Sequence, residues 1–390
     1  MLAHTYYDED PRVRREAEAL VTAGREVDVF ALRRPDDAAE AVVQGVNVHR
    51  LGVQRHQGAP IGVYLGEYLD FFVRAAAALA GAQRARRYAL VQVHTIPDFL
   101  VFAASPLKLL GVPVVLDFHE AMPEFFRSRF AGLAGPLTSR LVELQELASA
   151  GMADAVIAAN VAVADRLVAA GVRADKVSVV HNSPNPALFD PKSYPRRAFA
   201  ADGVFRLVYA GALTPNYELD VLLAALHRLR SDRPGQPCHL DVYGRGDGED
   251  GLRAQAVSLR LDEVVTFHGR VPLESMAEAI AAADVGVSPV ARNTQTDLSL
   301  PTKILEYARM GKPIVASDLA TVLRYFPDGE LATYRAGDVA DLAAVLTGLL
   351  DEPKAAARRV KRAAARVAEL SWERESVAYL MLIERLATRE

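Results

Sequence analysis

Short apolar segments alternate with amphipathic segments along almost the whole chain, and this alternation limits the possible folds more than any other feature. Segments such as EVDVFA (26–31) and PVVLDF (113–118) have the length and composition of buried strands. Between the strands lie segments with helical spacing of apolar residues, as in PRVRREAEALVTA (11–23). Repeated β–α units predict parallel sheets with helices on both faces. The expected fold class is therefore α/β, with Rossmann-like doubly wound domains.

One segment, residues 183–203, lacks this alternation and divides the chain of 390 residues into two parts. Four prolines interrupt it: Pro184, Pro186, Pro191 and Pro195. Such a segment is typical of a linker, and the length of the chain suits two domains. We predict a first domain over residues 1–188 and a second over residues 203–370. The apolar terminal helix expected at 371–390 must pack on another element, and we expect it to return to the first domain.

The chain begins inside a strand pattern. Only Leu2 and Ala3 precede His4 as strand residues, whereas a central strand usually has about five residues. We therefore expect the first strand to be truncated, either by a misplaced start codon or by the choice of the expressed segment, and whether Met1 is the native start stays open.

Composition excludes several classes of function. The net charge is −4 and no stretch is strongly basic with interleaved aromatic residues, so we do not expect a nucleic-acid partner. The single cysteine, Cys238, excludes disulfides within the chain and speaks against a cysteine zinc site. No apolar run approaches the roughly 18 residues of a membrane span, and the acidic residues 8–10 are not compatible with a signal peptide. We expect a cytoplasmic protein.

The segment SLPTKILEYARMGKPIVAS (299–317) reads as a turn, a short helix and a buried strand. Pro301 suits the first position of a helix, and Gly311 suits its end. Free N–H groups at a helix N-terminus bind phosphate, and Lys303 in the first turn adds a positive charge. Glu306, one turn later, could accept hydrogen bonds from a sugar diol. The segment thus predicts a site for a nucleotide-sugar, although Lys303 and Glu306 could also form a solvated ion pair.

Glycine residues follow three predicted strands of the second domain, at Gly211, Gly244 and Gly269. Parallel sheets bind ligands beyond the carboxyl ends of their strands, and glycine lets backbone N–H groups approach a phosphate. These loops and the helix at 299–317 together predict a nucleotide-diphosphate pocket. The residues predicted to bind the nucleotide-sugar, as the donor of a sugar, are Gly211, Ala212, Gly244, Arg245, Gly246, Arg270, Ser299, Leu300, Pro301 and Thr302.

Two histidines, His94 and His119, directly follow strands of the first domain. An imidazole there can hydrogen-bond a substrate hydroxyl or stabilise a transient positive charge. The sequence contains no metal-ligand cluster that we recognise, and Asp10 in the acidic segment 8–10 suits the cap of the following helix. The candidates for contact with an acceptor, the molecule that would receive the sugar, are Asp10, Arg12, His94 and Glu120.

Four stretches of the sequence resemble family 4 glycosyltransferases. They are DPRVRREAEALVTAGREVDVFAL, LDFHEAMPEFF, ADAVIAANVAVADRLVAAGVRADKVSVVHN and SLPTKILEYARMGKPIVAS. The resemblance covers nearly the whole chain and implies the GT-B fold, in which two Rossmann-like domains face each other across a cleft. It also implies a UDP-, GDP- or dTDP-sugar donor bound by the second domain, transfer with retention, and no bound metal or cofactor.

The resemblance implies roles for individual residues. Glu306 is similar to the carboxylate that binds the donor ribose, and His119 to the histidine near the transferred sugar. Residues 299–303 would line the diphosphate and sugar, and Gly246 would lie near the nucleotide. The expected catalytic residues are His119, Lys303 and Glu306.

The sequence departs from the family pattern at three positions. Many relatives carry a glutamate eight residues before the one similar to Glu306, where this chain has Leu298. Many also carry Arg and Lys on the diphosphate where this chain has Ala212 and Tyr217. A diphosphate leaving group without a metal needs cations, so Lys303 is the expected substitute, with Arg245, Arg270 and Arg292 in reserve.

The resemblance implies a retaining glycosyltransferase that acts on an acceptor hydroxyl in cell-surface polysaccharide, glycolipid or glycosylated natural-product synthesis. Two alternatives stay open. A sugar-nucleotide epimerase shares the architecture, and a non-catalytic nucleotide-sugar binding protein would explain the three departures. The oligomeric state is also open.

The helix predicted at 64–87 combines aromatic residues with arginines. They are Tyr64, Tyr68, Phe71, Phe72, Arg74, Arg84, Arg86 and Arg87. Such a helix can lie on an anionic membrane surface, which would fit peripheral contact with the inner face of the membrane and a lipid-linked acceptor. The alternative is that the aromatic side chains belong to the core and the arginines are solvated.

Overall fold

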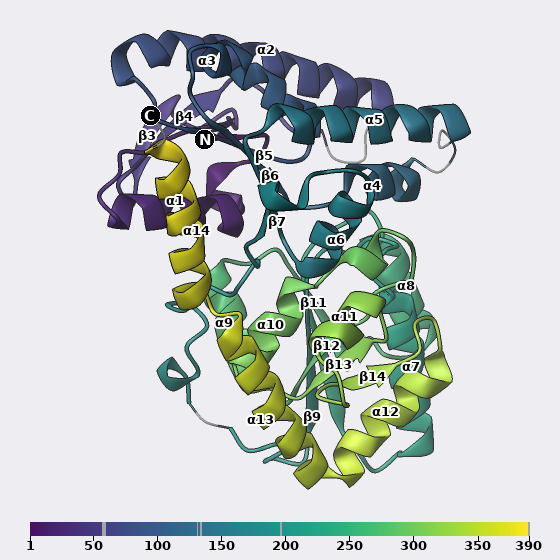
Figure 1. Cartoon of the computed structure of the whole chain (residues 1–390). Coiled ribbons are helices and arrows are strands. Elements are labelled where there is room, and N and C mark those ends of the chain that lie inside the picture. The colour runs from purple at the N-terminus through teal and green to yellow at the C-terminus, as the bar shows by residue number, and fades with distance from the viewer. Residues whose placement is uncertain (57–59, 131, 133–134, 196, 389–390) are drawn as a thin grey trace. The chain divides into compact units, whose positions relative to one another are not determined.

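The structure, a computed structural model, describes residues 1–56, 60–130, 132, 135–195 and 197–388 (Figure 1). The chain divides into two compact units. Unit 1 consists of Met1–Asn182 and the segment from Glu373 onward, and unit 2 consists of Ser183–Trp372. The C-terminal segment therefore belongs to the same unit as the N-terminal half of the chain; residues 389 and 390 of the predicted terminal helix lie outside the described residues.

Unit 1 contains, among the described residues, an eight-stranded sheet in the order β3-β4-β2-β1-β5-β6-β7-β8. Its strands are β1 (Leu2–Ala3), β2 (Asp28–Leu32), β3 (Glu40–Val43), β4 (Val46–Leu51), β5 (Val91–His94), β6 (Val114–Phe118), β7 (Ala155–Ala158) and β8 (Val177–Val179). All neighbouring strands pair in parallel except β3 and β4. This order places β1, β5 and β6 at the centre, where both faces of the sheet are buried.

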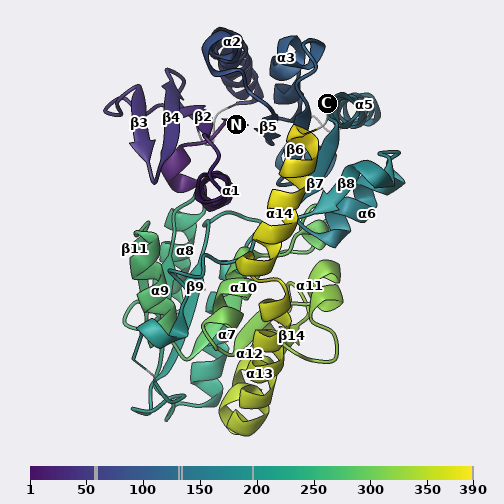
Figure 2. The ribbon, with the colours of Figure 1, turned by 60° about the vertical axis from the view of Figure 1, so that its left-hand side comes forward.

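Helices cover both faces of this sheet, as Figures 1 and 2 show: α2, α3 and α5 on one face, and α1, α6 and α14 on the other. The helices of unit 1 are α1 (Pro11–Thr22), α2 (Ile61–Arg86), α3 (Ser105–Leu109), α4 (Met122–Arg129), α5 (Pro136–Met152), α6 (Val161–Ala169) and α14 (Trp372–Ala387). The three-layer arrangement is the one predicted from the repeated β–α units.

The edge of the sheet differs from the parallel pattern expected from the sequence, because β3 and β4 form an antiparallel hairpin. Gln44 and Gly45 connect them with φ angles of 50° and 81°. Positive φ at both central residues matches the twist of a two-residue hairpin turn. The local turn thus allows one antiparallel strand on an otherwise parallel sheet.

The long helix α2 turns its aromatic side chains inward. Phe71 is buried, the Tyr68 ring packs edge-on against His4 with centroids 4.8 Å apart, and Phe72 lies 6.1 Å from the Phe99 ring. Phe71 therefore belongs to the core, whereas Tyr68 and Phe72 are half-buried against neighbouring rings. Exposed aliphatic side chains form a stripe along the same helix at intervals of four residues: Ile61, Leu65, Leu69 and Val73. Among the described residues, no helix combines the length and apolar content that crossing a bilayer requires.

Unit 2 contains, in the part of the chain described, a six-stranded parallel sheet in the order β11-β10-β9-β12-β13-β14. The strands are β9 (Phe205–Ala210), β10 (Cys238–Tyr243), β11 (Val265–Gly269), β12 (Val285–Ser288), β13 (Ile314–Ser317) and β14 (Ala332–Tyr334). The helices are α7 (Leu219–Asp232), α8 (Glu249–Ser258), α9 (Leu273–Ala282), α10 (Thr302–Arg309), α11 (Ala320–Tyr325), α12 (Val339–Asp351) and α13 (Pro353–Glu369). Leucines of α7 and α12 form the core on one face of the sheet.

Helix α10 packs closely on the sheet of unit 2 through Tyr307. Gly286 of β12 makes this possible, since a Cβ atom there would lie 2.2 Å from the Tyr307 ring. The Tyr307 hydroxyl accepts a hydrogen bond from the Ala210 N–H at 3.1 Å, at the end of β9. These contacts fix the N-terminal turn of α10 beside the loops that follow the central strands.

Candidate active site

The loops after β9 and β10 lie against each other so closely that they require glycine. A Cβ atom on Gly244 would come within 1.7 Å of the Gly211 carbonyl oxygen, and one on Gly246 within 2.2 Å of the Leu213 oxygen. The N–H groups of Gly211 and Gly244 donate to Tyr243 and Gly269 at 3.0 and 2.8 Å. The expectation that these two N–H groups face a phosphate is therefore wrong, because the neighbouring strands already use them. Here glycine serves close packing of the chain.

Lys303 lies at the first turn of α10 and points into this packed region. Its residue is 5% exposed, and its ammonium nitrogen lies 4.1 Å from the ring centroids of both Tyr209 and Tyr217. Among the described residues no hydrogen-bond partner of this nitrogen is found. A Cβ atom on Gly211 would be 2.6 Å from it, so the missing side chain of Gly211 makes room for the lysine. Burial lowers the pKa of Lys303 to about 7, although the nearby charge of Glu306 acts in the opposite direction.

The N-terminus of α10 has no side-chain cap: Pro301 is the residue before the helix and offers no side-chain acceptor. The Ile304 N–H already donates to the Pro301 carbonyl at 3.0 Å, so the N–H groups of Thr302 and Lys303 are the ones in this turn that an anion could bind. Ser299, Leu300 and Thr302 are half-buried around this end, as is Glu306 one turn later. The Ser299 hydroxyl donates to the Gln295 carbonyl at 3.2 Å. The structure thus brings Lys303, Gly211 and the start of α10 together.

A cavity of about 520 Å³ lies at the ends of β10 and β11. Arg245 and Gly246 line it together with Asp247, Glu249, Asp250, Arg253, Phe267, His268 and Gly269. The His268 ring stacks on Tyr243 with centroids 4.3 Å apart, and its Nε2 lies 2.6 Å from an Asp241 carboxylate oxygen. Arg270 is exposed and does not belong to this lining. The cavity has both an aromatic wall and charged groups, which suits a nucleoside.

The structure shows the surroundings of the residues that depart from the family pattern and of their possible replacements. Near Leu298, Asp297 accepts the Ala320 N–H at 3.1 Å. The reserve cation Arg292 pairs with Asp318 at 2.9 Å, and its role stays a prediction. Ala212 is exposed and uncharged. Tyr217 does not supply a charge, but its ring forms one wall of the Lys303 pocket. Lys303, which the sequence analysis expected to replace the missing cations, therefore lies directly against the side chain at position 217.

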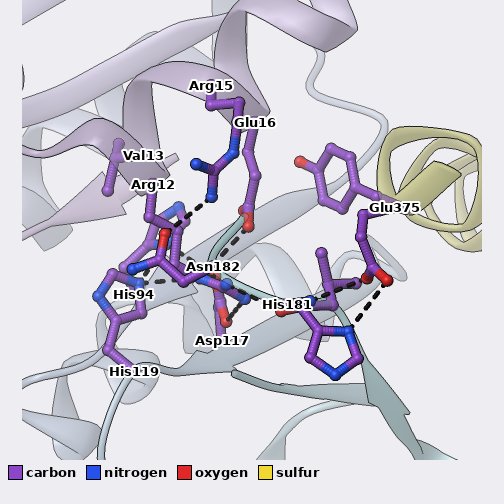
Figure 3. Close-up of polar contacts among 12 residues, drawn as sticks. Arg12, Val13, Arg15, Glu16, His94, Asp117, His119, His181, Asn182 and Glu375 are labelled. Atoms are coloured by element: carbon purple, nitrogen blue, oxygen red, sulfur yellow. Dashed lines mark hydrogen bonds and ion pairs between the residues drawn. The ribbon is translucent and has the colours of Figure 1, made fainter. Parts of the chain in front are cut away.

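In unit 1, Asp117 forms the centre of a buried charge network (Figure 3). Both of its oxygens accept from Arg12, at 2.7 and 2.9 Å, and both residues are at most 2% exposed. Arg12 also donates to the Val180 carbonyl at 2.9 Å. Burial alone would raise the pKa of Asp117, but Arg12 and the hydrogen bonds from His119 and His94 hold it well below its usual range. Asp117 therefore stays ionised inside the unit.

The predicted acceptor-side residue His94 and the predicted catalytic residue His119 meet at this carboxylate (Figure 3). His94 Nδ1 lies 3.2 Å and His119 Nε2 3.6 Å from one Asp117 oxygen, and the two ring nitrogens lie 3.1 Å apart. Burial lowers the pKa of His94. For His119 burial acts in the same direction, but Asp117 outweighs it and raises the pKa. His119 is therefore the histidine that more readily carries a positive charge.

These three residues could formally form a metal donor set, since their ligand atoms lie within 4.8 Å of one another. Arg12 already binds both oxygens of Asp117. A cation would have to displace this guanidinium and would be repelled by it. The arrangement fits a hydrogen-bond network better than a metal centre, and the absence of a metal from the reaction stays a prediction.

The network continues from Arg12 to the C-terminal helix. Glu16 lies 3.3 Å from Arg12 and accepts from Gln92 at 2.6 Å, and the Tyr379 hydroxyl of α14 donates to Gln92 at 2.7 Å. Burial and the charge of Asp117 raise the pKa of Glu16 to about 7. Glu375 of the same helix accepts from His181 at 2.9 Å (Figure 3). Helix α14 thus supplies part of the shell around Asp117.

The remaining acceptor-side candidates lie beside this network. Asp10 caps α1 by accepting the N–H groups of Arg12 and Val13 at 3.1 Å each, as the sequence predicted. Glu120 is half-buried directly after His119. Sequence reasoning missed Asp117, Glu16, Gln92 and Tyr209. A charged residue inside the apolar strand PVVLDF was the available signal, because a buried charge needs a partner.

Two family models match the chain. One is described as a glycosyl transferase 4-like domain and covers residues 10–183. The other is described as glycosyl transferases group 1 and covers residues 204–352. The chain belongs to the family 4 type of glycosyltransferases, and its two α/β units form the GT-B fold.

Individual relatives agree with this assignment. A D-inositol 3-phosphate glycosyltransferase of Thermomonospora curvata is 28% identical over 92% of this chain and 85% of its own length. A sucrose-phosphate synthase of Thermosynechococcus elongatus has a similar structure, with 19% identity, a TM-score of 0.78 and coverage of 99% and 98% of the two chains. HepE of Anabaena in complex with UDP-glucose matches with 16% identity, a TM-score of 0.72 and 98% coverage of each chain. The protein is a glycosyltransferase.

Proposed function

We propose that unit 2 binds a nucleotide-diphosphate sugar and that Lys303 is the main cation on its diphosphate. The observation that carries this proposal is a buried lysine without a hydrogen-bond partner, directed to Gly211 beside the uncapped start of α10. A side chain this costly to bury is retained where a ligand needs it. The cavity lined by Arg245 and Gly246 would hold the nucleoside, and Glu306 the ribose.

The proposed reaction moves the sugar to an acceptor hydroxyl with retention. The bond between the sugar and the diphosphate breaks first, and the developing negative charge is stabilised by Lys303 and the N–H groups of α10. The acceptor oxygen then attacks from the same face, and the departing phosphate takes its proton. No step of this scheme requires a nucleophile from the protein.

We assign the acceptor side to unit 1, with His119 as the catalytic residue and Asp117 and Arg12 as its positioning residues. The raised pKa of His119 favours the imidazolium, which suits donation to a substrate oxygen or stabilisation of negative charge. His94 would stay neutral beside it. Asp10 and Glu120 are close in sequence to this group and complete the proposed acceptor side.

A donor panel tests the proposal. The full chain is incubated with UDP-, GDP- and dTDP-sugars, with and without acceptors, and nucleoside diphosphate and sugar products are measured. Release of nucleoside diphosphate that depends on acceptor, with a product of retained configuration, is the expected result. An altered sugar without acceptor would support epimerisation instead, and binding without turnover would support a non-catalytic protein. The names of the relatives, all of transfer reactions, favour transfer.

The acceptor panel follows from the relatives and from helix α2. Inositol phosphates belong in it because the relative from Thermomonospora curvata is named for such an acceptor. Lipid-linked sugars belong in it because α2 exposes the aliphatic stripe of Ile61, Leu65, Leu69 and Val73, which supports peripheral contact with an anionic membrane. Co-sedimentation with phosphatidylglycerol vesicles at low salt should occur and should weaken in Leu65→Ser/Leu69→Ser. Equal recovery of both proteins in the supernatant would rule out this contact.

A further inference from the structure

The strongest unassigned feature is the environment of the Lys303 nitrogen, and the inference from it rests on the proposed donor site. We propose that Lys303, buried between Tyr209 and Tyr217 without hydrogen-bond partners among the described residues, is uncharged until the diphosphate of the donor binds, and that it then takes up one proton from the solvent. The ligand class is a nucleoside diphosphate or its sugar ester. The two tyrosine rings are the new site residues.

The geometry supports an uncharged lysine before binding. The side-chain nitrogen lies between two aromatic rings, 4.1 Å from each centroid, and the residue is only 5% exposed. Its nitrogen has no hydrogen-bond partner in the described part of the chain. An ammonium group has three N–H donors, and leaving all three unpaired out of water is costly.

Among the described residues, the ionisable groups around Lys303 do not provide a buried counter-ion in contact with its nitrogen. Tyr209 and Tyr217 face it, and burial raises the pKa of Tyr209, so this phenol stays neutral. Strands β12 and β13, on which α10 packs, contain no ionisable side chain. Within the described residues, Glu306 on the same helix is the charged group that affects Lys303, and its effect is smaller than that of burial. The net result is a pKa of about 7 for Lys303.

A diphosphate would reverse this balance. Its oxygens can accept the three N–H bonds and bring a full negative charge next to the nitrogen, so the charged form becomes the stable one. The proton comes from solvent and binds the lone pair of the Lys303 nitrogen, and no other bond changes. Attraction to the two rings favours the cation in part, so the uptake is less than complete near neutral pH.

Calorimetry of the full chain with UDP and with GDP measures this uptake. Titrations at pH 8 in HEPES and in Tris, which differ in ionisation enthalpy, give the number of protons exchanged. We expect uptake of between about half and one proton per nucleoside diphosphate, since the terminal phosphate is already ionised at this pH. In parallel, the dissociation constant should rise up to about tenfold per pH unit between pH 8 and 9.

Matched variants identify the group. Lys303→Met should bind more weakly and take up no proton, and Lys303→Arg, which stays charged, should bind without uptake. Lys312→Met removes a different half-buried lysine outside the proposed site, so it should behave as the wild type. Wild-type binding without uptake, or uptake that persists in Lys303→Met, would overturn the inference while leaving the donor site in place. Failure of the wild type to bind any nucleoside diphosphate would overturn the donor site as well.

Discussion

Asp117 in unit 1 and Lys303 in unit 2 are both charged residue types in buried positions, and the protein treats them in opposite ways. Asp117 has a bidentate arginine and lies near two histidines, and its pKa falls well below the usual range. The Lys303 nitrogen lies over two tyrosine rings and has no hydrogen-bond partner in the part of the chain described. Its pKa falls to about 7. The fold stabilises the charged form of Asp117, whereas it disfavours the charged form of Lys303.

The difference indicates what each site is for. A buried charge that is fully paired inside the protein holds neighbouring groups in place, as Asp117 does for His94, His119 and Arg12. A buried charge left without a partner costs folding free energy and is useful only when a ligand completes it. The comparison predicts that substitutions at Asp117 affect stability first, whereas substitutions at Lys303 affect turnover first.

Asp117→Asn should have the largest effect. It leaves the buried Arg12 without its charge partner, which costs on the order of 3–5 kcal/mol of unfolding free energy and lowers Tm by roughly 6–20 °C. Calorimetry of the variant checks this. The control is Asp154→Asn, which weakens a half-exposed pair with Lys108 and should cost at most about 1 kcal/mol. Equal stability of Asp117→Asn and wild type would show that Arg12 does not depend on Asp117.

Lys303→Met comes next and should act on activity. Loss of the cation on the leaving diphosphate should reduce kcat/KM by about 10²–10³-fold, the usual effect of removing one group that stabilises developing charge. Stability should be equal or higher, because an apolar side chain of similar length replaces a buried amine. Lys312→Met, in which the lost lysine bonds the Ala281 and Ala283 carbonyls, should retain turnover. If Lys303→Met unfolded more readily than the wild type but kept its activity per folded molecule, the expected contrast with Asp117 would be contradicted.

Glu16→Gln tests the pH dependence of the unit 1 network. Glu16 has a folded-state pKa of about 7, whereas an unfolded Glu titrates near pH 4. Between these values the folded state binds more protons, so the contribution of Glu16 to stability falls as pH rises from about 4 to 7. Glutamine does not titrate, so the variant should gain Tm relative to wild type with rising pH, by roughly 2–5 °C at pH 8.

The control for Glu16→Gln is Glu18→Gln on the same helix, where Glu18 forms a half-exposed pair with Arg14. At pH 8 its Tm should stay close to that of the wild type, because an ion pair this exposed contributes at most about 1 kcal/mol. A constant Tm difference for Glu16→Gln from pH 4 to 8 would mean that Glu16 is already ionised in the folded protein.

Tyr379→Phe should have the smallest effect. It removes one buried hydroxyl that donates to Gln92 at 2.7 Å and should cost about 0.5–1.5 kcal/mol in thermal unfolding. Val377→Ala, at an exposed position of the same helix, should stay within about 0.5 kcal/mol. Indistinguishable Tm values for the two variants would exclude α14 as part of the support of Asp117.

Much of the architecture could be predicted from the sequence, because strand and helix patterns are local. The alternation of segments such as EVDVFA and PRVRREAEALVTA predicted parallel α/β sheets, and the structure has them. The antiparallel β3 was missed, since a hairpin turn at Gln44–Gly45 is specified by two φ angles rather than by a periodic pattern. The segment 299–317 was predicted to form a turn, a short helix that carries Lys303, and a buried strand. The structure has this helix and this strand.

The sequence by itself determined the fold class, the family and the choice of Lys303, His119 and Glu306 as candidates, because motifs and periodicity are carried by neighbouring residues. Only the tertiary structure decided which charges are paired. Arg12 and Asp117 are 105 residues apart in sequence, and Tyr209 is far from Lys303, so no local pattern could connect them. Burial sets the cost of a charge, and burial is a property of the folded chain, which is why the contrast between Asp117 and Lys303 emerged only there.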